Sequence, residues 1–225
     1  LLDPYNYFLG TAELNTLNTA LNSSNVSILT TNSSNSGINS VFGNSSGGGY
    51  QIGSGHIVLT NDFIYTGSNN TTLTLTANAD IYLKNISSTN AALTLNLNTS
   101  GDQVFLDGDI VTNGGSVNFN SQDVHLQKSG DQSIVTSNGN LDFNNSDIKL
   151  LKSGGAVIYN TGSGNLELGE GVIEYTNTKW SISSPNNLMS WSGRKDGRND
   201  NTDIDTGVDI VTGKEYSMRL FLWDS

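Results

Sequence analysis

Short runs in which an apolar residue alternates with a polar one recur along most of the chain. Examples are Leu73/Leu75, Leu93/Leu95 and Leu166/Leu168. Alternation with a period of two places the apolar side chains on one face of a β-strand. Asn- and Gly-rich segments such as Asn138-Gly139-Asn140 separate the runs, and both residue types tolerate the positive φ of a sharp corner. The pattern predicts many short strands joined by tight corners.

These strands recur with a period of about 24 residues. A parallel β-helix requires one such period, because each coil places its inward residues above those of the next coil. A β-sandwich or an antiparallel barrel also has short alternating strands, but neither needs a constant interval. We therefore predict an all-β fold, a right-handed parallel β-helix, in which stacked Asn side chains form hydrogen-bonded ladders. The apolar positions form three series: Leu93, Val117, Leu141 and Leu166; Ile86, Ile110, Ile134 and Ile158; and Val124, Ile148 and Ile173.

The two ends of the chain follow this period poorly. Residues 1–60 include a predicted short helix, Thr11 to Leu21, with three leucines on one face, and then an Asn/Ser/Gly-rich loop. Residues 61–178 form the predicted parallel β-helix. Residues 179–225 hold all three tryptophans, and we expect them to form a cap or the start of a following module.

Composition supports a β fold and narrows the partners. Asn, Ser and Thr make up over a third of the chain, and all three favour helices poorly. The net charge of −11 argues against a nucleic-acid partner, which would require Lys and Arg to neutralise phosphates. With no cysteine, disulfides and thiolate metal sites are excluded. No apolar run approaches the roughly 20 residues that a transmembrane helix needs.

Three segments carry a resemblance to a known family. They are the opening Leu1-Leu2-Asp3-Pro4-Tyr5-Asn6-Tyr7, the coil from Leu73 to Ile81 (LTLTANADI), and Thr178 to Pro185 (TKWSISSP). In this order they resemble the filamentous haemagglutinin-like exoproteins, bacterial adhesins exported by two-partner secretion. The chain lacks that family's N-terminal secretion signatures, so its secretion would depend on sequence outside these residues.

The resemblance implies a β-helical shaft that is secreted or exposed on a bacterial cell surface and contributes to cell adhesion and virulence. Its expected partners are a host glycan or surface protein and, for the parent protein, an outer-membrane two-partner-secretion transporter. Repetition along a stiff shaft would add weak contacts through avidity. Two alternatives remain open: a β-helical polysaccharide lyase or hydrolase, and a passive stalk for toxin delivery.

Clustered carboxylates would be needed for a lyase or hydrolase. The candidates are Asp102, Asp107, Asp109 and Asp123, which we interpret as solvated corners or coil edges. His125 lies between two apolar residues and should therefore point outward as a lone exposed imidazole. His56, the other histidine of the chain, is also isolated in sequence. We expect no catalytic or cofactor site and no enzyme activity.

Two further patterns are weaker candidates for binding. Thr72, Thr74 and Thr76 share one outward face, and a threonine array of this kind can bind ice if it recurs on successive coils, but Leu93-Thr94-Leu95-Asn96 keeps only part of it. An acidic run near the C-terminus is rich in calcium-type oxygen ligands, but its order does not fit an EF-hand loop. Its members are Asp196, Asp200, Asp203, Asp205 and Asp209.

Overall fold

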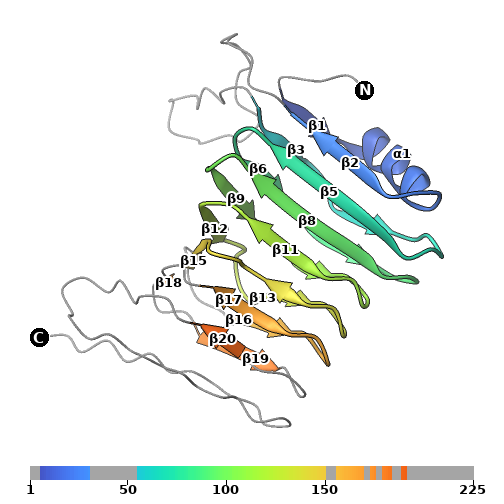
Figure 1. Ribbon diagram of the computed structural model, residues 1–225. Helices are drawn as coiled ribbons and strands as arrows, with labels where there is room; N and C mark the ends of the chain where they lie inside the picture. Colours follow the sequence, from blue (N-terminus) through green and yellow to red (C-terminus); the bar gives the residue numbers. More distant parts are fainter. Residues whose placement is uncertain are drawn as a thin grey trace, which may run out of the picture.

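The chain winds into a β-solenoid whose coils are built from parallel strands (Figure 1). A computed structural model describes residues 6–30, 55–150, 156–169, 173–175, 179–183 and 189–191. Within these residues the strands form three sheets of seven, six and seven members, and each strand pairs with strands one coil away. The predicted all-β solenoid with a short helix is thus confirmed.

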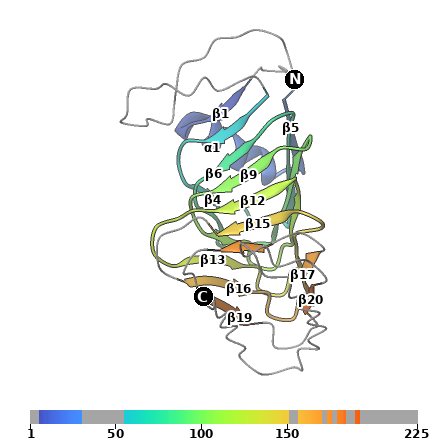
Figure 2. The ribbon, with the colours of Figure 1, turned by 90° about the vertical axis from the view of Figure 1, so that its left-hand side faces the viewer.

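The three sheets run along the stack of coils, as Figures 1 and 2 show from two sides. The first sheet contains β1 (Tyr7–Leu9), β3 (Ile57–Leu59), β6 (Ile81–Leu83), β9 (Gln103–Leu106), β12 (Asp123–Leu126), β15 (Asp147–Leu150) and β18 (Ile173–Tyr175). The second contains β4 (Phe63–Tyr65), β7 (Ile86–Ser88), β10 (Ile110–Val111), β13 (Gln132–Val135), β16 (Ala156–Asn160) and β19 (Lys179–Ser183). The third contains β2 (Val26–Leu29), β5 (Thr71–Ala77), β8 (Leu93–Thr99), β11 (Val117–Asn120), β14 (Leu141–Asp142), β17 (Leu166–Gly169) and β20 (Met189–Trp191).

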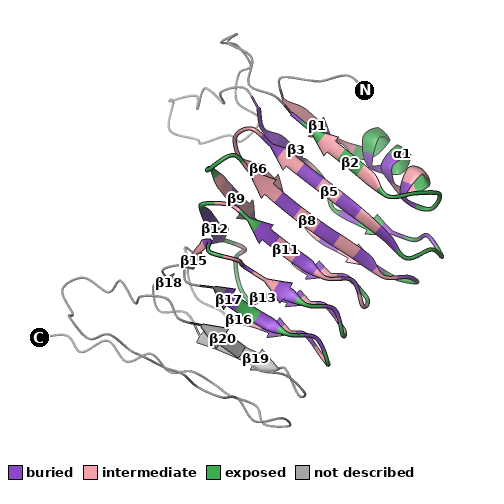
Figure 3. Cartoon of the chain, viewed as in Figure 1, coloured by how far each residue is buried: buried purple, intermediate pink, exposed green. Residues whose placement is uncertain are grey.

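The core fills the inside of the coils with the apolar half of each alternating strand. In β5, for example, Leu73 and Leu75 are buried while the threonine between them, Thr74, is partly exposed, an alternation visible in Figure 3. Aromatic rings also stack inside the solenoid: Phe119 lies 4.9 Å from Phe143, ring centre to ring centre, with the ring planes 9° apart. Burial of these stacked apolar rows is the main favourable term in folding.

The register between coils corrects two of the three predicted series. Val117 pairs with Leu95, not with Leu93, because the intervening coil is shorter than the average period and both leucines face inward. Ile134 pairs with Tyr159, not with Ile158, since one extra residue shifts the phase there. Tyr159 is accordingly buried and Ile158 partly exposed. The third series, in which Val124, Ile148 and Ile173 are in register, is confirmed.

A helix closes the N-terminal end of the solenoid. α1 (Thr11–Leu21) has the predicted bounds, and its leucines Leu14, Leu17 and Leu21 are buried against the core. It follows β1 in the chain and contacts β4, the end strand of the second sheet. The first coil therefore uses a helix where later coils use a strand of the second sheet. This insertion, and the long segment before β3, explain why Tyr7 pairs with Ile57 outside the 24-residue period.

Buried hydroxyls and close glycine contacts hold the corners of the coils. Thr112 and Thr136 are fully buried, and each donates its side-chain hydrogen bond to the carbonyl three residues on, at Gly115 and Gly139. Asn138, next to Gly139, adopts a φ of 93°, as predicted for a corner. Gly139 has no positive φ; it is required because an added Cβ would lie 2.2 Å from the Gly115 carbonyl oxygen.

The solenoid extends beyond the boundary expected at residue 178. β19 pairs with β16 and β20 pairs with β17, both in parallel, so Lys179–Ser183 and Met189–Trp191 continue two of the sheets. The sequence signal for a boundary was a change in composition, which does not prevent strand pairing. Most of the predicted Asn/Ser/Gly-rich loop and residues 192–225 lie outside the described residues. In the part of the chain described, no helix is long and apolar enough to cross a bilayer.

Candidate functional site

The outer face of the first sheet carries two rows of side chains that are polar or aromatic except for Val58, and we call it the polar–aromatic face. Because the strands are parallel and in register, each row gathers side chains from successive coils. Figure 2 views this sheet with β6, β9, β12 and β15 one above another. The first row comprises His56, Asp80, Gln103, Asp123 and Asp147. The second comprises Val58, Tyr82, Phe105, His125 and Lys149.

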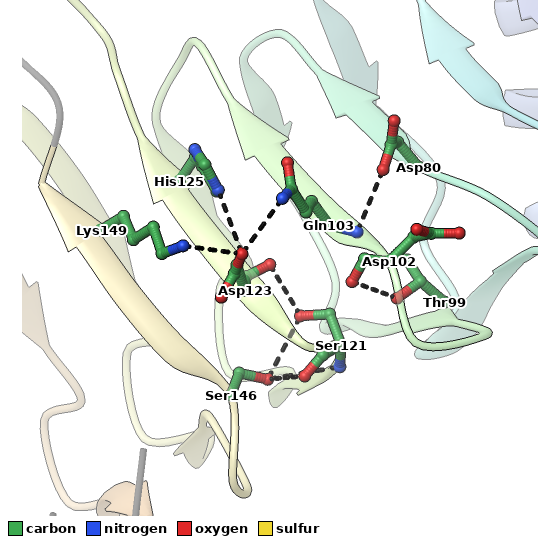
Figure 4. Close-up of polar contacts among 9 residues, drawn as sticks. All are labelled: Asp80, Thr99, Asp102, Gln103, Ser121, Asp123, His125, Ser146 and Lys149. Carbon is green, nitrogen blue, oxygen red and sulfur yellow. Dashed lines mark hydrogen bonds and ion pairs between the residues drawn. The ribbon is translucent and has the colours of Figure 1, made fainter. Parts of the chain in front are cut away.

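Asp123 is the centre of a network that joins three coils (Figure 4). Its side chain is almost completely buried, with 2% exposed. Its Oδ2 accepts hydrogen bonds from Lys149 Nζ at 2.9 Å and from Gln103 Nε2 at 3.1 Å. His125 Nε2 lies 3.6 Å from the same oxygen. The Lys149 ammonium compensates the buried carboxylate, which would otherwise be costly to desolvate.

Asp80 organises the neighbouring part of the face. Its Oδ2 accepts a hydrogen bond from the Tyr82 hydroxyl at 3.1 Å, and its Oδ1 accepts one from the Gln103 backbone N–H at 3.1 Å. The Asp80 backbone N–H in turn donates to His56 Nδ1 at 3.2 Å. This bond fixes His56 in the tautomer that carries its proton on Nε2. Since Gln103 Nε2 also donates to Asp123, hydrogen bonds connect Asp80 to Asp123 through Gln103.

Aromatic rings form a stack along the second row. The rings of Tyr82 and Phe105 are parallel within 5°, with centres 4.7 Å apart. The His125 ring lies 4.5 Å from Phe105 at a tilt of 48°. Tyr82 and Phe105 are partly exposed, whereas His125 is buried. The face therefore presents ring surface beside carboxylate and amide groups.

Burial controls the charge of the histidines and the tyrosine on this face. It lowers the pKa of both His56 and His125, and the raising influence of Asp80 and Asp123 opposes it only in part. Burial, together with Asp80, raises the pKa of Tyr82. At neutral pH the imidazoles and the phenol are therefore uncharged. Lys149 is the cation that balances Asp123.

Lowering the pH from about 7 to about 5.5 is expected to destabilise the fold. A histidine in the unfolded chain titrates near pH 6.5, while the folded pKa of His125 is lower. Below pH 6.5 the unfolded state thus binds more protons, and the free energy of unfolding falls, by up to about 1.4 kcal/mol per pH unit for each histidine. Well above pH 6.5 the histidine is neutral in both states and the effect disappears.

Urea unfolding at a series of pH values measures this slope, with His125→Phe as the comparison. The phenyl ring keeps the contact with Phe105 but cannot titrate. The slope should be shallower in His125→Phe than in the unsubstituted chain. Equal slopes between pH 6.5 and 5.5 would show that His125 is not the responsible group.

The structure places the four predicted carboxylate candidates in different surroundings. Asp107 Oδ2 pairs with Lys84 Nζ at 2.6 Å, and Asp109 Oδ2 pairs with Lys128 Nζ at 2.5 Å. Asp102 is exposed. These three lie at coil edges and corners, as interpreted from the sequence. Asp123 is the exception, because it is buried in the network and not solvated.

The prediction for His125 is wrong in its exposure. Val124 and Leu126 face the core, so His125 belongs to the outward row as expected, but only 7% of it is exposed. Neighbouring coils supply Phe105 and Lys149, which pack around it. His56 is likewise 7% exposed and contacts Asp80. The calcium candidates from Asp196 to Asp209 lie outside the described residues.

Sequence reasoning missed Tyr82, Gln103, Phe105 and Lys149. Each lies at the outward position of a strand whose inward positions were recognised. The residue after each inward position points outward, so these positions would have aligned Tyr82 with Phe105. That alignment also requires the register in which Ile81 pairs with Val104. Among the described residues, no three His, Asp or Glu side chains are grouped closely enough to hold a metal ion.

Comparison with known proteins gives no relative for this chain. No protein-family model matches it, and neither the curated proteins nor the solved structures yield a match. The resemblance to filamentous haemagglutinin-like exoproteins remains a prediction from the three sequence segments.

Proposed function

We propose that the chain is part of a stiff shaft in a secreted or surface-exposed bacterial adhesin-like exoprotein, and that it contacts host glycans through the polar–aromatic face. The observation that carries the proposal is the pairing of the Tyr82–Phe105 ring stack with the partly exposed side chains of Asp80 and Gln103. The exposed edges of the stacked rings offer an apolar surface to the C–H groups of a sugar, while carboxylates and amides bind its hydroxyls.

Rigidity supports the same proposal. Every residue of the second row lies in a strand that pairs with strands on both sides, so little backbone conformational entropy is lost on binding. Successive coils lie about 4.8 Å apart, so residues repeated on several coils can bind the glycans of a host surface at once. Weak contacts repeated in this way add through effective concentration. The parent protein would use a two-partner-secretion transporter in the outer membrane.

Replacing Phe105 by alanine is expected to weaken glycan binding at least tenfold. The substitution removes the central ring of the stack, and a loss of about 1.4 kcal/mol in binding free energy corresponds to that factor. A glycan array identifies ligands for the unsubstituted chain, and biolayer interferometry then compares the variants. Val111→Ala is the matched control, since it truncates a partly exposed outward side chain of another sheet.

Two results would count against this proposal. Silence of the unsubstituted chain across the array would remove the glycan as ligand and leave the passive stalk. Equal weakening by Phe105→Ala and Val111→Ala would show that the polar–aromatic face is not the binding surface.

A polysaccharide lyase or hydrolase is the second candidate, favoured by the approach of Lys149 and His125 to Asp123. A carboxylate, an amine and an imidazole can share acid–base roles. However, Asp123 Oδ1 and both ring nitrogens of His125 are shielded from solvent, and these atoms have no hydrogen-bond partner in the described part of the chain. A substrate could not reach them in this conformation.

We expect no new sugar ends when the protein is incubated with pectin-like or capsular polysaccharides, and their release would favour the enzyme.

A further inference from the structure

The outer face of the third sheet is a regular array of hydroxyl and amide groups. It covers β5, β8 and β11, which lie side by side in Figure 1. The correct register aligns Thr74 with Asn96 and Asn96 with Asn118. We call this array the hydroxyl–amide face. Its nine members are Thr72, Thr74, Thr76, Thr94, Asn96, Asn98, Ser116, Asn118 and Asn120.

Hydrogen bonds along the columns fix the orientation of the amides. Asn118 Nδ2 donates to Asn96 Oδ1 at 2.8 Å, and Asn96 Nδ2 donates to Thr74 Oγ1 at 3.2 Å. Asn120, Asn98 and Thr76 form a second, parallel ladder, with bonds of 2.9 and 3.2 Å. These are the predicted Asn ladders. The threonines are further restricted by β-branching at χ1, so the face presents its polar groups in one defined arrangement.

The face carries no charged residue, although 14% of the chain is charged. A charge first enters these columns at Asp142, which pairs with Asn118 on the next coil. The nine outward positions also lack aromatic and large apolar side chains, unlike the polar–aromatic face. Without cations the face does not suit a polyanion, and without apolar anchors it does not suit a protein interface.

A lattice of water molecules fits these properties. The groups repeat about every 4.8 Å between strands and about every 6.7 Å along a strand, intervals of the same order as the oxygen repeats on the surfaces of ice. Each Asn Nδ2 has a second N–H beyond its ladder bond, and each hydroxyl has donor and acceptor capacity. Water molecules that already bridge such fixed groups lose little further entropy when they become part of an ice crystal.

We propose that the hydroxyl–amide face binds ice. The threonine array itself does not recur on the next two coils, where only Thr94 is kept, but outward hydroxyl and amide groups continue in register across all three coils. Many weak, rigidly spaced contacts to a solid surface act together. The proposal is independent of glycan binding, which uses the first sheet.

Uptake of the protein into slowly growing ice tests the proposal. The unsubstituted chain should be enriched in the ice fraction at least fivefold over a non-binding protein such as albumin, and should show thermal hysteresis. Asn96→Lys places a long charged side chain at the centre of the face and should reduce uptake to the albumin level. Ser87→Lys is the matched control, an outward, partly exposed position on β7 of the second sheet. It should be taken up as well as the unsubstituted chain.

A second face variant guards against misfolding as an explanation. Thr94→Lys disturbs the same face but removes no ladder hydrogen bond that Asn96 makes, and it should also abolish uptake. Circular dichroism and the unfolding temperature establish that each variant is folded. Exclusion of the unsubstituted chain from ice would overturn the proposal. Retained uptake in both folded face variants, or equal loss in Ser87→Lys, would overturn it as well.

Discussion

Replacing Gly139 by alanine is expected to lower the free energy of unfolding by about 3 kcal/mol. The new Cβ would lie 2.2 Å from the Gly115 carbonyl oxygen and 2.4 Å from its carbon, both in the backbone of the preceding coil. Neither atom can move without disturbing the corner, and overpacking of this kind costs roughly 1–3 kcal/mol or more. Urea unfolding followed by circular dichroism measures the loss.

Gly101→Ala is the control for this prediction. Gly101 has a φ of 88°, but no atom lies within 4 Å of an added Cβ. Its substitution should therefore cost only about 1–2 kcal/mol, from the left-handed backbone. If Gly139→Ala proved no more destabilising than Gly101→Ala, the close stacking of corners would be incorrect. The comparison separates contact between coils from backbone strain within a coil.

Replacing Phe143 by alanine is expected to cost about 3–5 kcal/mol, the usual range for a fully buried phenylalanine. Phe143 is completely buried and lies between two other rings, with Phe119 at 4.9 Å and Tyr159 at 5.5 Å between ring centres. These rings come from three successive coils. Loss of the Phe143 ring leaves a cavity that the paired strands cannot close.

Phe143→Leu serves as the matched substitution. Leucine fills much of the volume without the ring contacts and should cost about 1.5 kcal/mol. The unfolding transitions of both variants and the unsubstituted chain give the comparison. A loss below about 1 kcal/mol for Phe143→Ala would mean that the ring does not lie in the core.

The fold was largely predictable from the sequence because apolar residues recur with the period of the coils. Alternation fixed which side chains face inward, and α1 was predicted with its observed bounds. The exact register was not predictable. Leu93, Leu95 and Leu97 all face inward, so periodicity alone cannot decide which of them stacks on Val117. Only the length of each corner decides this, and corner lengths vary between coils.

The candidate site was less predictable for the same reason. Val104 and Val124 pair although they are only 20 residues apart, so the coil between them departs strongly from the period. That short coil places Gln103 beside Asp123 and Phe105 beside His125. From the sequence, Asp123 and His125 were a solvated acid and an isolated imidazole. Their burial depends on side chains from neighbouring coils, which local patterns do not reveal.

The central claim, that the shaft binds glycans through repeated contacts on the polar–aromatic face, is tested most directly by the dependence of binding on glycan density. The array-identified glycan is immobilised at increasing density, and dissociation of the unsubstituted chain and of Phe105→Ala is followed by biolayer interferometry. If several coils bind at once, dissociation of the unsubstituted chain slows steeply as density rises, and Phe105→Ala dissociates at least tenfold faster at every density. Dissociation that does not depend on density, or that is the same for both proteins, would contradict the claim.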